Sequence, residues 1–391
     1  MKKLDTLTHV TNSGFNAPYV WYRDMRLANP VWYDEEAGMW RVFKYDDVKR
    51  VLSDYDVFSA QKYMLEGVET DHTSPIDASI LNLDPPRHRE LRSLVSKAFT
   101  PRSIAQLAPK IQHITHDLLA TVNKRGAMDV VRDLAFPLPV IVIAELIGIP
   151  REDLHQFKRW SDAVVEDDET AFIQAEQEMG EYFPRIMAER RLKPREDLIS
   201  RLVAVEEAGQ QLSEREIIGF CELLLVAGNE TTTNLIANAM LCFAAYPEAW
   251  QALQDNRELL PSAIEEVLRF RSPVKAMSRL TKAPIRLRDR DIPEGAVVVA
   301  YIASGNVDEE KFPNADTFDI TRSPNQHLGF GHGIHFCLGA PLARLEARIA
   351  LEALLAQFHT FHSVRETALE MIPSFVVHGV KQLPITFETH A

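Results

Sequence analysis

The sequence predicts a mainly α-helical protein with small β-sheets, organised as a single domain over residues 1–391. Two observations predict this fold class. Long segments repeat their apolar residues three and four positions apart, which is the spacing of one face of a helix. Segments that read as strands are short, and they come in pairs around turn residues. No linker, repeat or low-complexity segment divides the sequence.

Helix signals are strong in four places. A Ser-Glu-Arg-Glu capping box predicts the start of a very long helix over residues 213–245. An apolar stripe over residues 104–118 predicts one helix that ends near Gly126. Pro261 and Pro341 each suit the first turn of a further helix, because a first-turn residue needs no backbone N–H.

The strand signals predict three hairpins. Each consists of two apolar segments that flank turn residues such as glycine, proline or aspartate. The expected pairs are residues 31–33 with 39–43, residues 285–288 with 296–302 around Pro-Glu-Gly, and the two halves of 375–387 around Gly379.

Composition and charge exclude several classes of protein. The net charge is −13, whereas a nucleic-acid-binding protein needs a basic face. No apolar signal core follows the first residues. The most apolar run, residues 220–240, is interrupted by Glu222, Asn229 and Glu230, so it is a poor membrane span. Only three cysteines are present, which favours a reducing compartment. We therefore expect a cytoplasmic protein with no membrane span and no nucleic-acid partner.

One glycine-rich loop carries the most specific chemistry. It reads Phe-Gly-His-Gly-Ile-His-Phe-Cys-Leu-Gly from Phe330 to Gly339. The thiolate of Cys337 is a soft, electron-rich ligand that suits iron, and as an axial ligand of haem it favours O–O cleavage. Glycines on both sides, such as Gly331, let the backbone approach a flat macrocycle. His335 can reach a carboxylate at the edge of that macrocycle.

Three simpler interpretations of this loop stay open from these residues alone. Its glycines could form a nucleotide-binding loop, but no buried strand precedes them and the spacing is not G-x-G-x-x-G. Its histidines and Cys337 could bind zinc, but a structural zinc site needs four ligands. Cys337 could also be an ordinary core cysteine, which is the common role of a lone one.

A second group of candidate residues lies inside the predicted long helix. Burying a carboxylate in a helix that is apolar all round is costly, so the presence of Glu230 there indicates a functional role. Small Ala227 and Gly228 permit close approach of a flat ligand. A hydroxyl such as that of Thr231 can compete for the carbonyl one turn back and distort the helix. The result is a niche for O₂ beside an acid and an alcohol; the simpler alternative is an irregularity in a core helix.

A third element is Glu266-x-x-Arg269, an opposite-charge pair on one helical face. Alone, such a pair is typical of a surface contact. Taken together, these segments resemble the cytochrome P450 family, specifically its soluble bacterial members. The segment from Asp84 to Pro101 resembles the haem-facing third helix of the family. The resemblance covers nearly the whole chain in the expected order. It implies that haem b lies between the long central helix and the cysteine loop.

The resemblance also implies roles for named residues. Cys337 is implied to be the axial ligand of the haem iron, and Thr231 with Glu230 to deliver protons. The residues expected to contact the haem are His88, Arg92, Ala227, Gly228, Arg279, Phe330, Gly331, His335, Cys337 and Gly339.

A structural ion network of Glu266, Arg269 and Arg322 is implied behind the cysteine loop. Two segments depart from the pattern of the family. Its common Ala-Asn-Arg-Asp reads Ser-Gly-Asn-Val-Asp at residues 304–308, and the aspartate that usually follows the propionate-binding arginine is replaced around residues 283–284. Both departures are peripheral to the iron and bear on local loop geometry.

The resemblance implies a haem-thiolate monooxygenase. No flavin or nicotinamide domain is found in the sequence, so NAD(P)H-derived electrons are expected from a ferredoxin or flavodoxin with its reductase. A basic patch of Lys97, Arg102, Arg344 and Arg348 is expected to bind that partner. Two alternatives are a peroxide-driven peroxygenase, which usually has an arginine in place of the acid–alcohol pair, and a non-enzymatic haem sensor or carrier.

The expected substrate pocket is apolar. By resemblance it is lined by Met64, Leu65, Val68, Leu225, Val226, Ala276, Met277, Phe375, Val376 and Val377. Flexible methionine and apolar side chains suit adaptable binding of terpenoid, steroid or fatty-acid-like molecules. Several of these residues, Leu225 above all, can equally be ordinary core residues. Lys275 is the one nearby cation, a candidate anchor for a carboxylate.

Overall fold

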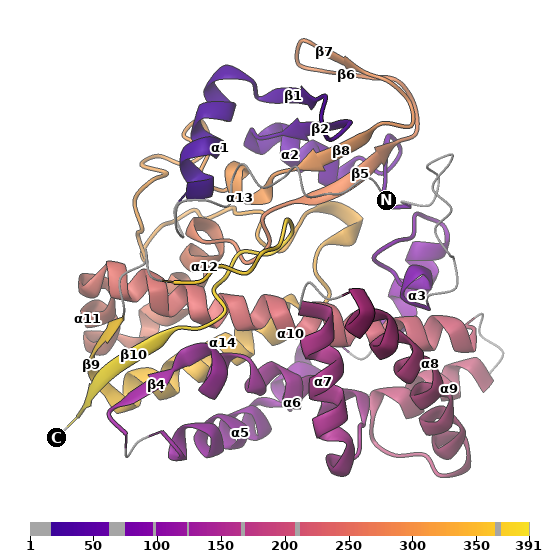
Figure 1. Cartoon of the computed structure of the whole chain (residues 1–391), viewed down its shortest axis with the longest axis vertical. Coiled ribbons are helices and arrows are strands. Elements are labelled where there is room, and N and C mark those ends of the chain that lie inside the picture. The colour runs from indigo at the N-terminus through magenta and orange to yellow at the C-terminus, as the bar shows by residue number, and fades with distance from the viewer. Residues whose placement is uncertain are drawn as a thin grey trace.

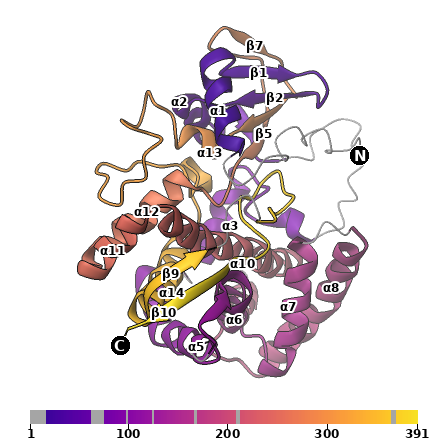
Figure 2. The same cartoon turned by 60° about the vertical axis from the view of Figure 1, so that its left-hand side comes forward.

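A computed structural model of the chain describes residues 17–61, 75–96, 99–122, 125–165, 169–207, 212–363 and 369–390. Within these ranges most of the chain is helical, and the β-sheets are small, which confirms the predicted fold class. In Figures 1 and 2 a five-stranded sheet with α1 and α2 lies at the top, α10 crosses the middle, and α5 to α9 lie below. No helix in these ranges is long and apolar enough to cross a membrane.

The helices have the following bounds: α1 Ala17–Ala28, α2 Tyr45–Ser53, α3 Arg87–Ser96, α4 Pro101–Ala105, α5 Ala108–Ala120, α6 Pro137–Ile147, α7 Leu154–Val165, α8 Glu169–Leu192, α9 Leu198–Glu207, α10 Glu214–Ala245, α11 Pro247–Asp255, α12 Leu260–Phe270, α13 Ile302–Gly305 and α14 Ala340–Gln357. Short turns of other helix types are η3 Pro75–Ala78, η4 Val131–Ala135, η5 Arg151–Asp153, η6 Arg257–Leu259 and η7 Gly333–His335.

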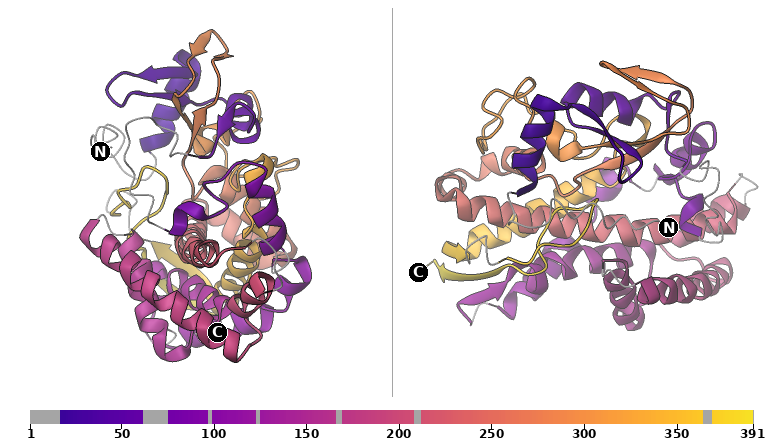
Figure 3. Two further views of the ribbon diagram at one scale, coloured as in Figure 1. Left: turned by 90° about the vertical axis from the view of Figure 1, so that its right-hand side faces the viewer. Right: turned by 45° about the horizontal axis from the view of Figure 1, so that its top comes forward.

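Helix α10 is the centre of the fold, and it begins as predicted. The Ser213 side chain accepts a hydrogen bond from the backbone N–H of Glu216, and the Glu216 carboxylate accepts one from the N–H of Ser213. At about 1.5 Å per residue, its 32 residues span about 48 Å. The left panel of Figure 3 looks nearly along this axis and shows other helices on several sides of it. The main apolar cluster includes Ile236 and Met240 of α10, and both are fully buried.

The predicted helix over residues 104–118 is wrong in one respect, because it is divided. Helix α4 ends at Ala105 and α5 begins at Ala108. Pro109 occupies the first turn of α5, and proline has no N–H to donate to the carbonyl four residues earlier. The apolar stripe therefore continues across a break in the backbone hydrogen bonds.

The main sheet has the strand order β1-β2-β8-β5-β3. Its strands are β1 Val31–Asp34, β2 Met39–Val42, β3 Phe58–Ser59, β5 Met277–Thr281 and β8 Val297–Ala300. Strands β1 and β2 form the first predicted hairpin, with Val31 opposite Val42. Strand β8 then pairs with β2 in parallel and with β5 antiparallel, so the sheet joins strands near the N-terminus to strands from residues 277–300.

The other two hairpins were predicted with the wrong partners. Residues 285–287 form β6, which pairs with β7, Arg290–Ile292, through a tight turn in which Arg288 has a φ of 54°. That early turn leaves residues 297–300 to join the main sheet as β8. In the tail, β10 (Pro384–Thr389) pairs with β9 (Phe358–Ser363) and β4 (Ala127–Asp129) rather than with the residues before Gly379.

Candidate active site

The cysteine loop folds into a compact turn in front of α14. The N–H of Cys337 donates to the carbonyl of Phe330 at 2.9 Å and closes the loop. Gly331 and Gly333 have φ values of 74° and 73°, which only glycine adopts without strain. A Cβ on Gly333 would also lie 2.8 Å from Cα of Ser53 on α2. These two glycines therefore allow both the turn and its close packing against α2.

The Cys337 thiol lies at the N-terminus of α14. Burial raises the pKa of the Cys337 thiol, while hydrogen bonds from the backbone N–H groups of Gly339 and Ala340 and the positive charge of Arg92 oppose this rise. The same groups can stabilise a thiolate that is bound to a metal. The other two cysteines, Cys221 and Cys242, are buried in α10.

Two histidines from distant parts of the chain meet beside this loop. His88 belongs to α3, and its ring centroid lies 4.4 Å from that of His335 in η7. Both ring nitrogens of His88 and Nε2 of His335 are buried. None of these three atoms has a hydrogen-bond partner among the described residues. Burial lowers the pKa of His88 to about 4 and that of His335 to about 3. Both imidazoles are therefore neutral at pH 7 and each has an N–H to donate.

Two arginines add positive charge to the histidine pair. Arg279 of β5 is 6% exposed, and burial lowers its pKa to about 10. The hydrogen bond it donates goes to the carbonyl of the adjacent Ser278, at 2.9 Å. Arg92 of α3 donates to the carbonyl of Phe336 at 2.6 Å. The buried donors of His88, His335 and Arg279, with the half-buried guanidinium of Arg92, fit the two carboxylates of a haem, and the thiol of Cys337 fits its iron.

On α10, Thr231 and Glu230 have different environments. The Thr231 hydroxyl donates to the carbonyl of Ala227 at 2.7 Å, the bond one turn back that was predicted. Glu230 is half-buried rather than fully buried, and Ala227 on the preceding turn is exposed. Burial raises the pKa of Glu230 to about 7. No residue in the described ranges forms a hydrogen bond with this carboxyl group.

Gly228 is small for a reason that the sequence did not indicate. A Cβ at Gly228 would lie 2.8 Å from Cδ1 of Ile143 on α6. Gly228 therefore lets α10 pack closely against α6, and a larger residue there would need the Ile143 side chain to shift. The neighbouring Asn229 donates to the hydroxyl of Ser161 on α7, which holds α10 from the same side.

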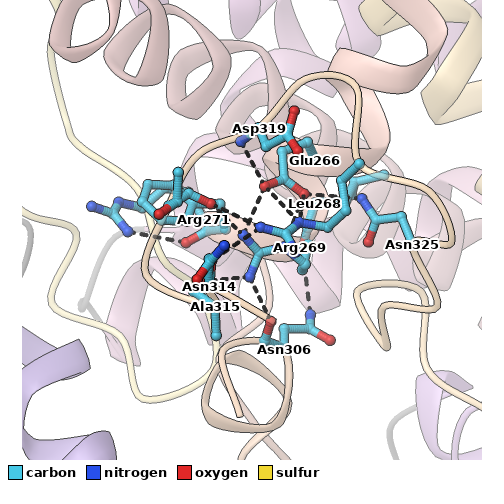
Figure 4. Close-up of polar contacts among 12 residues, drawn as sticks. Glu266, Leu268, Arg269, Arg271, Asn306, Asn314, Ala315, Asp319 and Asn325 are labelled. Atoms are coloured by element: carbon cyan, nitrogen blue, oxygen red, sulfur yellow. Dashed lines mark hydrogen bonds and ion pairs between the residues drawn. The ribbon is translucent and has the colours of Figure 1, made fainter. Parts of the chain in front are cut away.

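Glu266 and Arg269 form a buried ion pair on α12 (Figure 4). Nε and Nη2 of Arg269 donate to the two carboxylate oxygens of Glu266 at 2.8 and 2.7 Å, and both side chains are fully buried. Arg322 also donates to Glu266, at 3.2 Å. The remaining donors of Arg269 reach the carbonyls of Asn306, Ala315 and Thr317 at 2.8–3.0 Å. The structure thus brings together all three residues of the expected network.

The network contains members that the sequence reasoning missed. The side chain of Asn325 and the backbone N–H of Asp319 each donate to Glu266 at 3.0 Å. Asn306, in the segment that departs from the family pattern, accepts from the N–H of Leu328 at 2.6 Å and donates to Ser272 at 2.7 Å. It therefore connects α12 to the start of the cysteine loop. Asn306 is fully buried, and the sequence alone gives no signal of this role.

The expected pocket residues are only partly brought together. Met64, Leu65 and Val68 lie outside the described residues, as does Lys97 of the expected basic patch. Leu225 and Ala276 are fully buried in apolar clusters, so each has a packing role. Met277, Phe375 and Val226 are half-buried, Val376 is 41% exposed, and Val377 forms a β-bridge with Val274.

The expected basic patch is weaker than its sequence suggested. Arg344 donates to both carboxylate oxygens of Glu265, at 2.6 and 2.8 Å. Arg348 lies 3.9 Å from the carboxylate of Glu352, and Arg102 is exposed. Acidic partners therefore neutralise part of the positive charge.

Comparison with known proteins gives consistent matches over this chain. A family model described as cytochrome P450 matches residues 28–148 and 142–387. The putative cytochrome P450 YjiB of Bacillus subtilis is 46% identical over 379 residues, which cover 94% of this chain and 93% of the relative. The erythromycin C-12 hydroxylase of Saccharopolyspora erythraea is 40% identical over 379 residues, 93% of each chain. The crystal structure of CYP109E1 from Bacillus megaterium with testosterone is 42% identical, with a TM-score of 0.89 over 96% of this chain and 98% of that one.

Proposed function

The chain belongs to the cytochrome P450 family of haem-dependent monooxygenases, and we propose that it hydroxylates an apolar small molecule with electrons from a separate redox partner. The observation that carries this proposal is the cluster of His88, His335, Arg92 and Arg279 beside the Cys337 loop. It combines a soft metal ligand with buried donors for two carboxylates. Haem, when bound, supplies the activation of O₂ and the insertion of one oxygen atom.

Cys337 is the residue that we propose as the axial ligand of the iron. Its loop is held rigid by the 2.9 Å hydrogen bond to Phe330 and by the packing of Gly333 against α2. The N–H groups of Gly339 and Ala340 reduce the electron density on the sulfur and so tune the iron. Gly331 and Phe330 supply the backbone and the ring that face the macrocycle.

The two propionates of the haem are assigned to the neutral imidazoles of His88 and His335 and to the guanidinium groups of Arg92 and Arg279. Each carboxylate then gains charge-assisted hydrogen bonds, and the buried ring nitrogens of His88 and His335 gain the partners that they lack among the described residues. Ala227 and Gly228 of α10 would contact the haem and leave room for it, because both residues are small.

Proton delivery is assigned to Thr231 and Glu230. The Thr231 hydroxyl both donates to Ala227 and has lone pairs free to accept, so it can hold a proton donor near the reacting oxygen. A carboxyl group with a pKa of about 7 exchanges protons readily at neutral pH. Glu230 therefore suits the transfer of protons from solvent to the site.

We infer that the substrate is a terpenoid, steroid or fatty-acid-like molecule. Met277, Phe375, Val226 and Val376 are partly accessible apolar side chains near the proposed haem. Relatives described as an erythromycin hydroxylase and as a testosterone complex support bulky, largely apolar substrates. The electron donor is proposed to be a ferredoxin or flavodoxin with its reductase in the cytoplasm, bound near Arg102 and Arg348.

The test is to compare turnover of a panel of terpenoids, steroids and fatty acids under three conditions. These are NADPH with a bacterial ferredoxin and its reductase, hydrogen peroxide alone, and protein without either. Product that forms only with the redox partners supports the proposal. Product with peroxide alone indicates a peroxygenase, and binding without product in any condition contradicts a catalytic function.

A further inference from the structure

Lys275 lies between α12 and β5, against the C-terminal segment. Its backbone N–H donates to the carbonyl of Val376 at 2.6 Å, and its carbonyl accepts from the N–H of Ala303 at 3.0 Å. The side-chain ammonium donates to the carbonyl of Ser374. These backbone bonds join Lys275, two residues before β5, to the C-terminal segment on one side and to α13 on the other.

Lys275 precedes β5, the strand that carries Arg279 of the proposed haem cluster. Within β5 side chains alternate between faces, so Met277 and Arg279 share one face. The charge of Arg279 contributes to the lowered pKa of His335. Ala276, between Lys275 and Met277, is fully buried in an apolar cluster against which Phe375 also packs.

The ammonium of Lys275 has no counter-ion in the described part of the chain. Its hydrogen-bond partner, the carbonyl of Ser374, is neutral, and no carboxylate there forms an ion pair with it. Burial lowers the pKa of Lys275 to about 8, because partial removal from water destabilises the charged form. An anion that enters with a ligand would stabilise this charge.

The propionates of the haem do not account for this cation. Arg279, which is assigned to a propionate, lies four residues further along the chain, at most about 13 Å of extended backbone at about 3.3 Å per residue. The ammonium of Lys275 instead contacts the carbonyl of Ser374 in the C-terminal segment. Lys275 therefore suits a second anion, located near the C-terminal segment that carries the half-buried Phe375.

We propose that Lys275 binds the carboxylate of an amphipathic carboxylic acid, so that long-chain acids are favoured among the apolar substrates. This inference rests on the proposed function, because it assumes that the pocket beside Met277 and Phe375 is the substrate site. The apolar side chains hold the hydrocarbon part of the ligand, while Lys275 fixes one end. A fixed end would also limit which carbons reach the reacting centre.

The first experiment compares matched ligands on the haem-loaded protein. Saturated acids from octanoic to octadecanoic acid are titrated against the alcohols of the same chain length, with testosterone as a neutral control. The low-to-high-spin absorbance change and calorimetry report binding without turnover. We expect the acid to bind about tenfold or more tightly than its alcohol, the size of one hydrogen bond to a charged group.

The second experiment uses variants of Lys275. Lys275→Met keeps the length of the side chain and removes the charge, so it should lose the preference for the acid while the affinities for the alcohol and for testosterone stay unchanged. Lys275→Arg should retain the preference. Lys381→Met, which removes an exposed lysine of the C-terminal segment, is the matched control and should behave as the wild type. The CO spectrum of each variant checks that haem is bound.

Three results would overturn the inference. They are equal affinity of acid and alcohol in the wild type, no binding of any acid, or an equal loss of acid, alcohol and testosterone in Lys275→Met. The last outcome would mean that Lys275 only holds the segment at Ser374. Turnover of neutral substrates without an acid preference would leave the proposed function standing, whereas Lys275-dependent acid binding without turnover would refute the function alone.

Discussion

The rings of His88 and His335 lie 4.4 Å apart, and three of their four ring nitrogens are buried without a partner among the described residues. One histidine comes from α3 and the other from the cysteine loop, so folding alone brings them together. Unsatisfied buried donors are rare in proteins, and their presence as a pair indicates a ligand with acceptors.

We predict that His88→Phe weakens haem retention. The phenyl ring fills similar space but donates no hydrogen bond to a propionate. The loss of a hydrogen bond to a charged group costs about 1.5–3 kcal/mol, so haem should transfer to an acceptor such as apomyoglobin about tenfold to a hundredfold faster. His113→Phe, at an exposed position of α5, is the control. Equal transfer rates for His88→Phe and the wild type would remove His88 from the haem site.

Glu266→Ala should destabilise the protein severely. Its carboxylate accepts hydrogen bonds from Arg269, Arg322, Asn325 and the backbone of Asp319, and the change leaves the charge of Arg269 buried without its counter-ion. Breaking such a pair typically costs about 3–5 kcal/mol. Chemical denaturation and haem content should both report the loss.

The matched control is Glu370→Ala, which breaks the exposed ion pair with Lys381. Exposed pairs contribute about 0–1 kcal/mol, so this variant should unfold close to the wild type. If Glu266→Ala were as mild as this control, the network in Figure 4 would not stabilise the fold.

The stability of the protein should depend on pH through Glu230. Burial raises the pKa of this carboxyl from 4.5 to about 7, so the native state binds its proton more tightly than the unfolded state does. The stability contributed by this group is complete below pH 4.5 and is lost as the pH rises through about 7.

Glu230→Gln cannot ionise and avoids that loss. Its melting temperature should equal that of the wild type at low pH and exceed it at high pH. The corresponding difference in the free energy of unfolding at high pH is on the order of 2 kcal/mol. Glu294→Gln, at an exposed position, should show no such trend. A difference that is constant with pH would mean that the Glu230 carboxyl titrates normally.

Thr231→Ala should separate electron consumption from product formation. The variant keeps the cofactor site but loses the hydroxyl that positions the proton donor, so NADPH oxidation should continue while a larger share of the electrons forms hydrogen peroxide. Thr231→Ser keeps a hydroxyl and should stay close to the wild type. The ratio of product to NADPH consumed is the measurement, and a ratio unchanged in Thr231→Ala would exclude Thr231 from proton delivery.

Local signals predicted the elements that local interactions determine. The capping box at Ser213 and the apolar pattern after it are sufficient to specify α10, and the turn residues at 34–38 specify the first hairpin. Pro109 marks the break before α5 in the sequence, although the apolar stripe continues across it. The motif around Cys337 identified the site because its residues are close together in the chain.

Long-range pairing could not be predicted in the same way. Strand β10 pairs with β9 and β4 because Phe387 stacks on Phe358, with ring centroids 4.0 Å apart, and no local pattern selects that partner. The role of Gly228 depends on Ile143 of another helix. Asn306 connects the ion network to the cysteine loop through contacts that only the folded chain creates.

The measurement that tests the central claim most directly is the absorption spectrum of the reduced, CO-bound protein, recorded for the wild type and for Cys337→His. Thiolate ligation shifts the Soret band strongly to the red, so the wild type should show that band. Cys337→His should lose it because an imidazole replaces the thiolate, even where haem stays bound. A Cys337→His protein that keeps the wild-type CO spectrum would show that another residue holds the iron, and the proposed site would be wrong.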